Sequence, residues 1–313
     1  MKKIYKVLFS IFITLLTLYF LFKGIRLEEI KNNFIFSPII LLITILLFGI
    51  IKLTNTLRFA KNYNIKPSKE LFSNLCISNM FLSILPFRLG EISYLKNLKK
   101  LIGENYTNIG LKLAKIRLFD YLSISILLLI SSFFVYNKFS SIVNLISIFF
   151  ISSLFVGTLL CLLFIKLNMT NRIKIKKIQG VLISIENEIR SFNMKNLIFL
   201  LSISIISLIY WSLRLFMGYL VLNLLGINLS FFTISFISLA VFILSLIPLH
   251  FVAGFGITEG GFLFFLTQLG FSYEETLIKL FVYHIYIIIP VVAYGGASYL
   301  FKLKKHISCI QAK

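Results

Sequence analysis

The residues best suited to chemistry lie in two apolar stretches, one in each half of the chain. Each stretch is interrupted by proline and glycine and contains a carboxylate: residues 85–91 hold Arg88 and Glu91, and residues 248–259 hold Glu259. A broken helix frees backbone N–H and C=O groups that lipid cannot satisfy, so it persists only inside protein or beside a polar cavity. Interrupted segments in two halves of a chain therefore indicate a transport site near the bilayer midplane. The predicted helix-break residues are Pro86, Gly90, Pro248, Gly254 and Gly256.

Arg88 and Glu91 form the first candidate site. They are three residues apart, so a helix places both side chains on one face. In a functional interpretation, Arg88 binds a lipid phosphate with two parallel hydrogen bonds and Glu91 orients it. In a structural interpretation, the two residues form an internal ion pair that lets the segment enter the membrane.

Asp120 and Glu259 also lie in or beside apolar segments. A charge at the bilayer centre costs about 2.5–3.5 kcal/mol on insertion scales, so each needs a cationic partner, a water-filled cavity or a proton. Arg117 precedes Asp120 by three residues, which fits either an interfacial ion pair or a functional one.

Glu259 follows Gly254 and Gly256, which free the backbone to begin a helix there. Glu259 would then either cap that helix or act as the protonatable or ammonium-binding group of a transport site. Arg214, deep within an apolar segment, is the predicted partner of Glu259 or of a phosphate.

The remaining reactive residue types show no catalytic or metal-binding pattern. His250, His284 and His306 are far apart in sequence, and the three cysteines have no paired or metal-like spacing. No Ser-His-Asp arrangement or phosphate-binding glycine loop is present, so the sequence predicts no catalytic residue, metal or cofactor.

The elements that position these residues are membrane helices. Hydrophobic residues make up 58% of the 313 residues and charged residues only 14%, which indicates an integral membrane protein. We expect an all-α polytopic helical bundle with six full spans and two re-entrant helical hairpins at 71–90 and 231–269; eight full spans fit the charge pattern equally well. The expected spans are residues 4–22, 34–51, 118–136, 142–165, 196–222 and 277–301.

The net charge of +21 raises the question of nucleic-acid binding. Most of the basic residues, including Lys52 and Arg58, fall in the segments that share one side of the membrane in this topology. This bias is typical of cytoplasmic loops, so it predicts both termini in the cytoplasm and no nucleic-acid partner.

A single membrane domain over residues 1–313 is expected. The longest polar connection, 166–195, is too short for a soluble catalytic domain. Its apolar residues recur at helical spacing and indicate an interfacial helix. Four basic residues before that helix either attract anionic headgroups or are ordinary cytoplasmic loop charges: Arg172, Lys174, Lys176 and Lys177.

Four short segments give the chain a family resemblance. Residues 85–91 match an LPxRxGE pattern, and residues 57–59, with Arg58, match an LRW-type segment. Residues 117–120 match part of an ERLxD pattern, and residues 254–259 match the end of PGGxGxxE. In order and spacing these resemble the lysylphosphatidylglycerol synthase transmembrane-region family, the flippase-like domain of the multiple peptide resistance factor. The chain departs from the pattern at Ile116, Val252, Ala253 and His284.

The resemblance implies a stand-alone protein of a prokaryotic plasma membrane that moves aminoacylated or glycosylated lipids between leaflets. Arg88 and Arg214 would hold the lipid phosphate, and Glu259, Glu91 or Asp120 would receive a cationic headgroup or a coupling proton. The family's synthase chemistry resides in a separate soluble domain, so no transferase activity is expected here, although the family name could bring the label phosphatidylglycerol lysyltransferase. A separate synthase or glycosyltransferase would be a partner.

Three other functions fit the same residues. An ion or small-solute transporter would use the same charges in a cavity closed to lipid. A membrane enzyme would use Glu91 or Glu259 as acid or base on a lipid headgroup. A non-transporting membrane partner of a synthase would use them only structurally.

Overall fold

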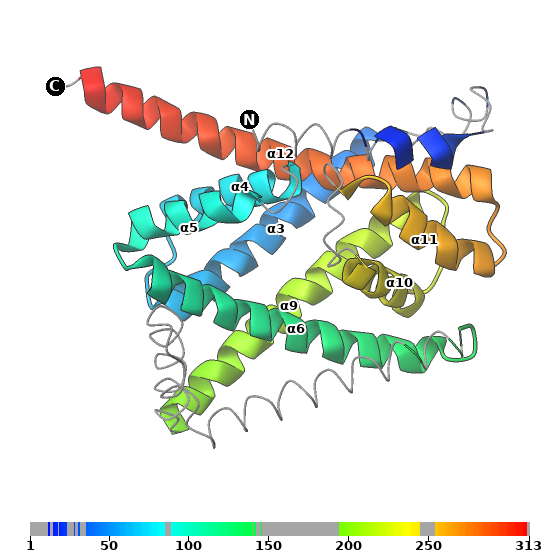
Figure 1. Cartoon of the computed structure of the whole chain (residues 1–313), viewed down its shortest axis with the longest axis horizontal. Helices are drawn as coiled ribbons and strands as arrows, with labels where there is room; N and C mark the ends of the chain where they lie inside the picture. Colours follow the sequence, from blue (N-terminus) through cyan, green and yellow to red (C-terminus); the bar gives the residue numbers. More distant parts are fainter. Residues whose placement is uncertain are drawn as a thin grey trace.

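A computed structural model shows a helical protein, in agreement with the predicted all-α class (Figure 1). The structure describes residues 36–84, 89–139, 194–244 and 254–311 and a few positions between 12 and 31 and at 141 and 145. The side chains of residues 89–93, 194–197, 244 and 304–311 are outside that description. The described helices are α3 (Pro38–Tyr63), α4 (Lys69–Ile84), α5 (Leu89–Ile102), α6 (Tyr106–Val135), α9 (Met194–Leu224), α10 (Phe231–Leu244), α11 (Ile257–Gln268) and α12 (Tyr273–Gln311).

Within the described ranges, four helices are long and apolar enough to cross a membrane. They are Pro38–Tyr63, Tyr106–Val135, Ile198–Leu224 and Tyr273–Leu303, which correspond to four of the six expected spans. More than half of the residues of span 4–22 and nearly all of those of span 142–165 lie outside the described residues.

Two of the expected boundaries are wrong. The expected span 34–51 continues as α3 to Tyr63, so Lys52 and Arg58 are buried helix residues and not part of a cytoplasmic loop. The expected span 118–136 begins at Tyr106, so Arg117 lies well inside α6. Both helices continue past their charged residues because those residues have partners or a cavity within the bundle.

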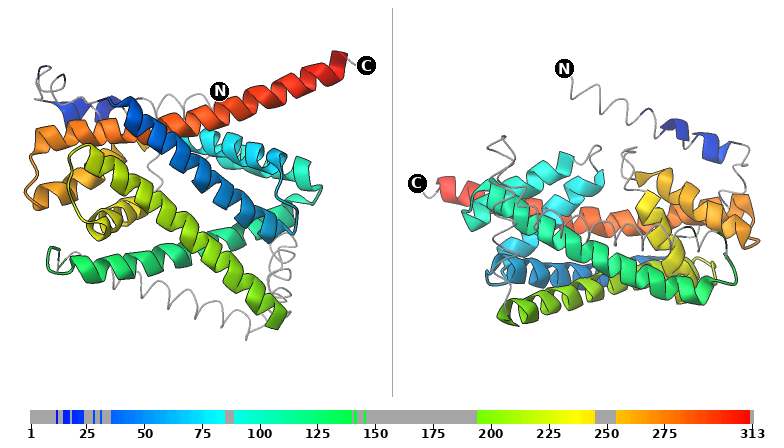
Figure 2. Two further views of the ribbon diagram at one scale, coloured as in Figure 1. Left: turned by 180° about the vertical axis from the view of Figure 1, so that it is seen from behind. Right: turned by 60° about the horizontal axis from the view of Figure 1, so that its bottom comes forward.

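The four spanning helices run in two directions: α3 and α12 run one way, and α6 and α9 run the other way. The C-terminal ends of α3 and α12 and the N-terminal ends of α6 and α9 lie on the same side of the molecule, at the left of Figure 1. The two views of Figure 2 show the same grouping. Spanning helices of both orientations are present, so the described part of the chain has the polytopic architecture expected from its hydropathy.

The two interrupted regions are pairs of helices. In the first, α4 packs against α5 and also lies along α12. In the second, α10 packs against α11 and contacts α6 and α9. The first pair extends beyond the expected limit of residue 90, because α5 continues to Ile102.

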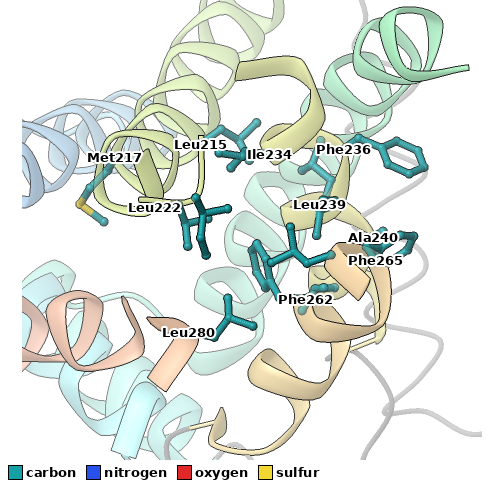
Figure 3. Close-up of a cluster of buried hydrophobic side chains, with 14 of the residues drawn as sticks. Leu215, Met217, Leu222, Ile234, Phe236, Leu239, Ala240, Phe262, Phe265 and Leu280 are labelled. Atoms are coloured by element: carbon teal, nitrogen blue, oxygen red, sulfur yellow. The ribbon is translucent and has the colours of Figure 1, made fainter. Parts of the chain in front are cut away.

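Two clusters of apolar side chains hold these pairs in place. The larger one joins α9, α10, α11 and α12 through residues such as Leu222, Phe236, Phe262 and Leu280 (Figure 3). The smaller one joins α3, α4, α5 and α6. The outward faces are also apolar, with Phe133 81% exposed, which fits helices whose outer surface contacts lipid.

At Gly295, helix α12 packs closely against α4, and this packing can be tested by mutation. A Cβ atom at Gly295 would lie 2.4 Å from Cβ of Met80, whereas nothing lies within 4 Å of the same position at Gly296. We expect Gly295→Ala to lower the free energy of unfolding by about 1–3 kcal/mol, because α4 must move away from α12. Gly296→Ala should be neutral or stabilising, since alanine favours a helix. Thermal unfolding of both variants in detergent measures the difference, and equal effects would contradict this packing.

Candidate functional site

A cavity of about 460 Å³ lies among α3, α4, α9, α10, α11 and α12. Its aromatic walls include Phe48 of α3, Tyr210 and Trp211 of α9, and Tyr283 of α12. Its polar lining comes from six helices: Lys52, Asn79, Ser83, Arg214, Ser238, Thr258 and His284. The cavity is thus an amphipathic chamber inside a set of membrane helices.

Lys52 and Arg214 make the cavity cationic. Lys52 is only 2% exposed, and its Nζ lies 5.0 Å from the ring centre of Phe48. The Arg214 guanidinium lies 5.0 Å from the Trp211 ring and 6.0 Å from the Tyr210 ring. Within the described part of the chain neither residue forms an ion pair, and no described residue lining the cavity is acidic. The positive charge is therefore available to a ligand.

Ser238 adds a hydrogen-bonding group to the same chamber. Its hydroxyl oxygen is buried and has no hydrogen-bond partner among the described residues. A buried hydroxyl without a partner costs free energy, so a polar ligand group or water in the cavity would be favoured there.

A buried ion pair contacts two of the aromatic residues that line the cavity, Tyr210 and Trp211. Arg58 of α3 pairs with Asp120 of α6, and both side chains are less than 10% exposed. Arg58 also donates hydrogen bonds to Asn55 Oδ1 at 2.9 Å and to Ser207 Oγ at 3.4 Å.

The same pair fixes the two aromatic residues of α9. The Arg58 guanidinium lies 4.5 Å from the centre of the Tyr210 ring. The Trp211 indole N–H donates to Asp120 Oδ1 at 2.8 Å. These contacts join three spanning helices and set the position of the rings on which Arg214 rests.

The expected Arg117–Asp120 pair is present but longer. Arg117 is about half exposed and its guanidinium is 3.9 Å from Asp120 Oδ2. The closer partner is Arg58, which the sequence indicated as a site residue only through the family resemblance. Spacing along one helix favoured Arg117, whereas packing of α3 against α6 supplies Arg58.

Glu259 lies at the start of α11, immediately after two glycines in the left-handed region. Gly254 has φ of 79° and Gly256 has φ of 95°, conformations that side chains other than glycine rarely adopt. The backbone N–H of Gly256 donates to Glu259 Oε2 at 2.6 Å. This hydrogen bond is the one that the capping interpretation requires.

The second oxygen of Glu259 contacts a residue that the sequence had left without a role. His284 Nδ1 of α12 lies 2.6 Å from Glu259 Oε1, and the His284 ring stacks on Phe255 at 4.1 Å. Glu259 is fully buried and does not line the cavity, whereas its partner His284 does. Arg214, the expected partner of Glu259, instead contacts aromatic rings.

Part of each interrupted stretch lies outside the described residues. Pro86 and Arg88, and Pro248 and His250 of the second stretch, lie outside the described residues. Gly90 and Glu91 fall in the first turn of α5, but the Glu91 side chain is not described. The Arg88–Glu91 site therefore remains a prediction.

Sequence reasoning missed Lys52 as a site residue. A hydropathy window ends the span just before it, and the topology placed its charge in a loop. The signal lay beyond that boundary: Ile51, Asn55, Phe59 and Asn62 continue the helical spacing through which α3 buries one face.

Replacing Glu259 tests the two contacts that it makes. We expect Glu259→Ala to lower the free energy of unfolding by about 1–3 kcal/mol, since it removes a cap and leaves buried polar atoms unpaired. Glu259→Gln should cost less, because an amide can accept from Gly256 N–H and donate to a neutral His284. Chemical unfolding in detergent measures both. Equal losses would mean that the charge of Glu259, and not its hydrogen bonds, holds the start of α11.

Comparison with known proteins gives one match. The family model described as the lysylphosphatidylglycerol synthase TM region matches residues 6–295, which is most of the chain. No curated protein and no solved structure matches it.

Proposed function

Because this chain belongs to the lysylphosphatidylglycerol synthase transmembrane-region family, we propose that it moves a polar-headed, phosphate-bearing lipid between the two leaflets of a membrane. Its place in this family and its apolar spanning helices make it a multi-pass membrane protein. The lipid movement, the lipid class and the roles of residues below are our proposal.

The observation that supports the proposal most strongly is the cationic cavity. Lys52 and Arg214 line it without a described acidic neighbour, at the level of apolar spanning segments. A positive charge kept from bulk water is stabilised by an anion, and guanidinium binds phosphate through two parallel hydrogen bonds. A lipid phosphate entering this chamber would therefore replace its hydration shell with Arg214, Lys52 and the Ser238 hydroxyl.

The two buried acid–base pairs have positional roles in this proposal. Asp120 and Arg58 hold the Tyr210 and Trp211 rings against which Arg214 lies. Glu259 fixes the start of α11 and orients His284 toward the cavity. Since both carboxylates have basic partners, we assign the binding of a cationic headgroup to Glu91 and a second phosphate contact to Arg88.

The substrate class follows from combining phosphate and headgroup. A phosphatidylglycerol lipid carrying an amino acid or a sugar has the phosphate that the cavity favours and a polar group that needs an aqueous path. In our proposal the headgroup crosses through the cavity while the acyl chains stay in lipid. The protein would sit in a prokaryotic plasma membrane with both termini cytoplasmic, beside a separate synthase or glycosyltransferase.

A leaflet-resolved transport assay tests this function. Purified protein in liposomes is offered aminoacylated, glycosylated and unmodified phosphatidylglycerol, and release of trapped ions and small solutes is followed in parallel. We expect lipid to change leaflet without solute release. Solute flux without lipid movement would replace the proposal with a solute transporter, and absence of both would favour a non-transporting partner of a synthase.

A further inference from the structure

A second cleft, of about 610 Å³, opens at the end of the molecule where α12 finishes its apolar span. It is lined by α4, α5, the start of α6 and α12. These helices lie next to one another at the left of Figure 1. The cleft shares no lining residue with the central cavity. The two hollows are therefore separate sites.

The cleft combines basic, aromatic and apolar groups. Four lysines line it, together with two tyrosines and one amide: Lys96, Lys99, Lys100, Lys302, Tyr106, Tyr299 and Asn97. Ile77 and Phe81 of α4 give it an apolar side. Among the described lining residues none is acidic, so the ammonium groups repel one another unless an anion lies between them.

Two of the lysines that line the cleft contact neighbouring side chains. Lys99 Nζ lies 4.1 Å from the ring centre of Tyr106. Lys302 Nζ donates to Asn74 Oδ1 at 2.8 Å. Neither contact neutralises the positive charge, so both lysines keep it for a ligand.

The place of the cleft along the spans indicates which anion it meets. Lys302 lies at the end of the apolar segment Tyr273–Leu303, beside Leu300 and Phe301, which are 67% and 72% exposed. Tyr106 begins the apolar helix α6. Tyrosine and lysine at the ends of spans mark the level of lipid headgroups, so a phosphate at this height belongs to a lipid whose acyl chains follow α12.

We propose that this lysine cleft, lined by Lys96, Lys99, Lys100 and Lys302, binds the phosphate of an anionic phospholipid as a resident lipid. The bound lipid joins the α4–α5 pair to the end of α12. This binding does not depend on the central cavity or on lipid movement, so it holds whether or not the proposed transport function does.

Tryptophan fluorescence offers a direct test, because the chain has a single tryptophan, Trp211, in the central cavity. Phe81→Trp places a second one beside the cleft, and the chain without that change supplies the Trp211 signal to subtract. The protein is placed in phosphatidylcholine bilayers that contain a small fraction of lipid with brominated acyl chains. Brominated phosphatidylglycerol should quench the new tryptophan at least about tenfold more effectively than brominated phosphatidylcholine, as expected for several lysines acting together on one anionic headgroup.

Matched triple variants locate that preference. The cleft variant, in which Gln replaces Lys96, Lys99 and Lys100, should lose the preference for phosphatidylglycerol. The control variant changes three exposed lysines outside the cleft at the same end of the molecule, Lys61, Lys66 and Lys69, to Gln. This variant should keep the preference for phosphatidylglycerol.

Four results would overturn the proposal. Equal quenching by the two brominated lipids means that no anionic lipid is selected. If both triple variants keep the preference for the anionic lipid, or both lose it equally, the preference comes from general surface charge and not from the cleft. Displacement by millimolar inorganic phosphate in the bulk phase means that the cleft takes a free anion and not a lipid.

Discussion

Arg214→Ala should slow leaflet-to-leaflet movement of a phosphate-bearing lipid by about 10- to 100-fold, since a hydrogen bond to a charged group contributes about 1.5–3 kcal/mol. Arg214 is an exposed residue that lines the cavity, and its guanidinium lies over the Trp211 and Tyr210 rings. Arg214→Lys should give an intermediate rate, because lysine keeps the charge but not the planar pair of donors. The measurement is the rate of lipid exchange between leaflets in liposomes of defined composition.

Controls separate loss of binding from loss of fold. Arg214 makes only ring contacts among the described residues, so its alanine variant should unfold at nearly the wild-type temperature. Lys138→Ala, which removes an exposed basic residue from the loop after α6, should leave the rate unchanged. A folded Arg214→Ala protein with the wild-type rate would remove Arg214 from the transport site.

Arg58→Ala or Asp120→Ala alone should lower the free energy of unfolding by about 3–5 kcal/mol, because each leaves a buried charge without its partner. The effect is larger than that of any surface pair in the described structure, since both side chains are less than 10% exposed and join α3 to α6. Replacing both residues with alanine should cost much less than the sum of the single changes, because no unpaired charge then remains. Chemical unfolding of the four proteins in one detergent gives the coupling energy.

Arg117→Ala is the matched control for that cycle. Arg117 also points at Asp120, but it is about half exposed and 3.9 Å away, so its removal should cost no more than about 1 kcal/mol. Additive effects of the Arg58 and Asp120 changes would show that the two residues act independently, and would leave Tyr210 and Trp211 without the support described here.

Much of the fold follows from the sequence because membrane helices obey a simple rule. A long apolar run must form a helix in lipid, since its backbone polar groups have no other partners. This rule predicted the four described spans and the two interrupted regions, whereas the family was indicated by four short motifs. It failed at the ends of α3 and α6, where hydropathy treats Lys52, Arg58 and Arg117 as loop residues. A helix continues through such charges when neighbouring helices supply an ion pair or a cavity, and hydropathy along one segment does not contain that information.

The site was less predictable because its contacts cross between helices. The sequence singled out Asp120 and Glu259 as buried carboxylates, and both are buried. Their main partners, Arg58 and His284, are 62 and 25 residues away in sequence, and helical spacing favours only partners three or four residues apart. His284 was noticed as a departure from the family pattern, which was the one available signal for its role.

The most direct test of the central claim uses two lipids that share acyl chains and headgroup sugar, of which only one carries a glycerophosphate unit between them. Glycosylated phosphatidylglycerol and the matching glycosyl diacylglycerol are placed in liposomes with the purified protein, and the leaflet position of each is followed over time. The account predicts that the phosphate-bearing lipid moves and that its movement depends on Arg214, while the phosphate-free lipid stays in place. Equal movement of both lipids, or movement unaffected by Arg214→Ala in a folded protein, would contradict the claim that the cationic cavity selects its substrate by the phosphate.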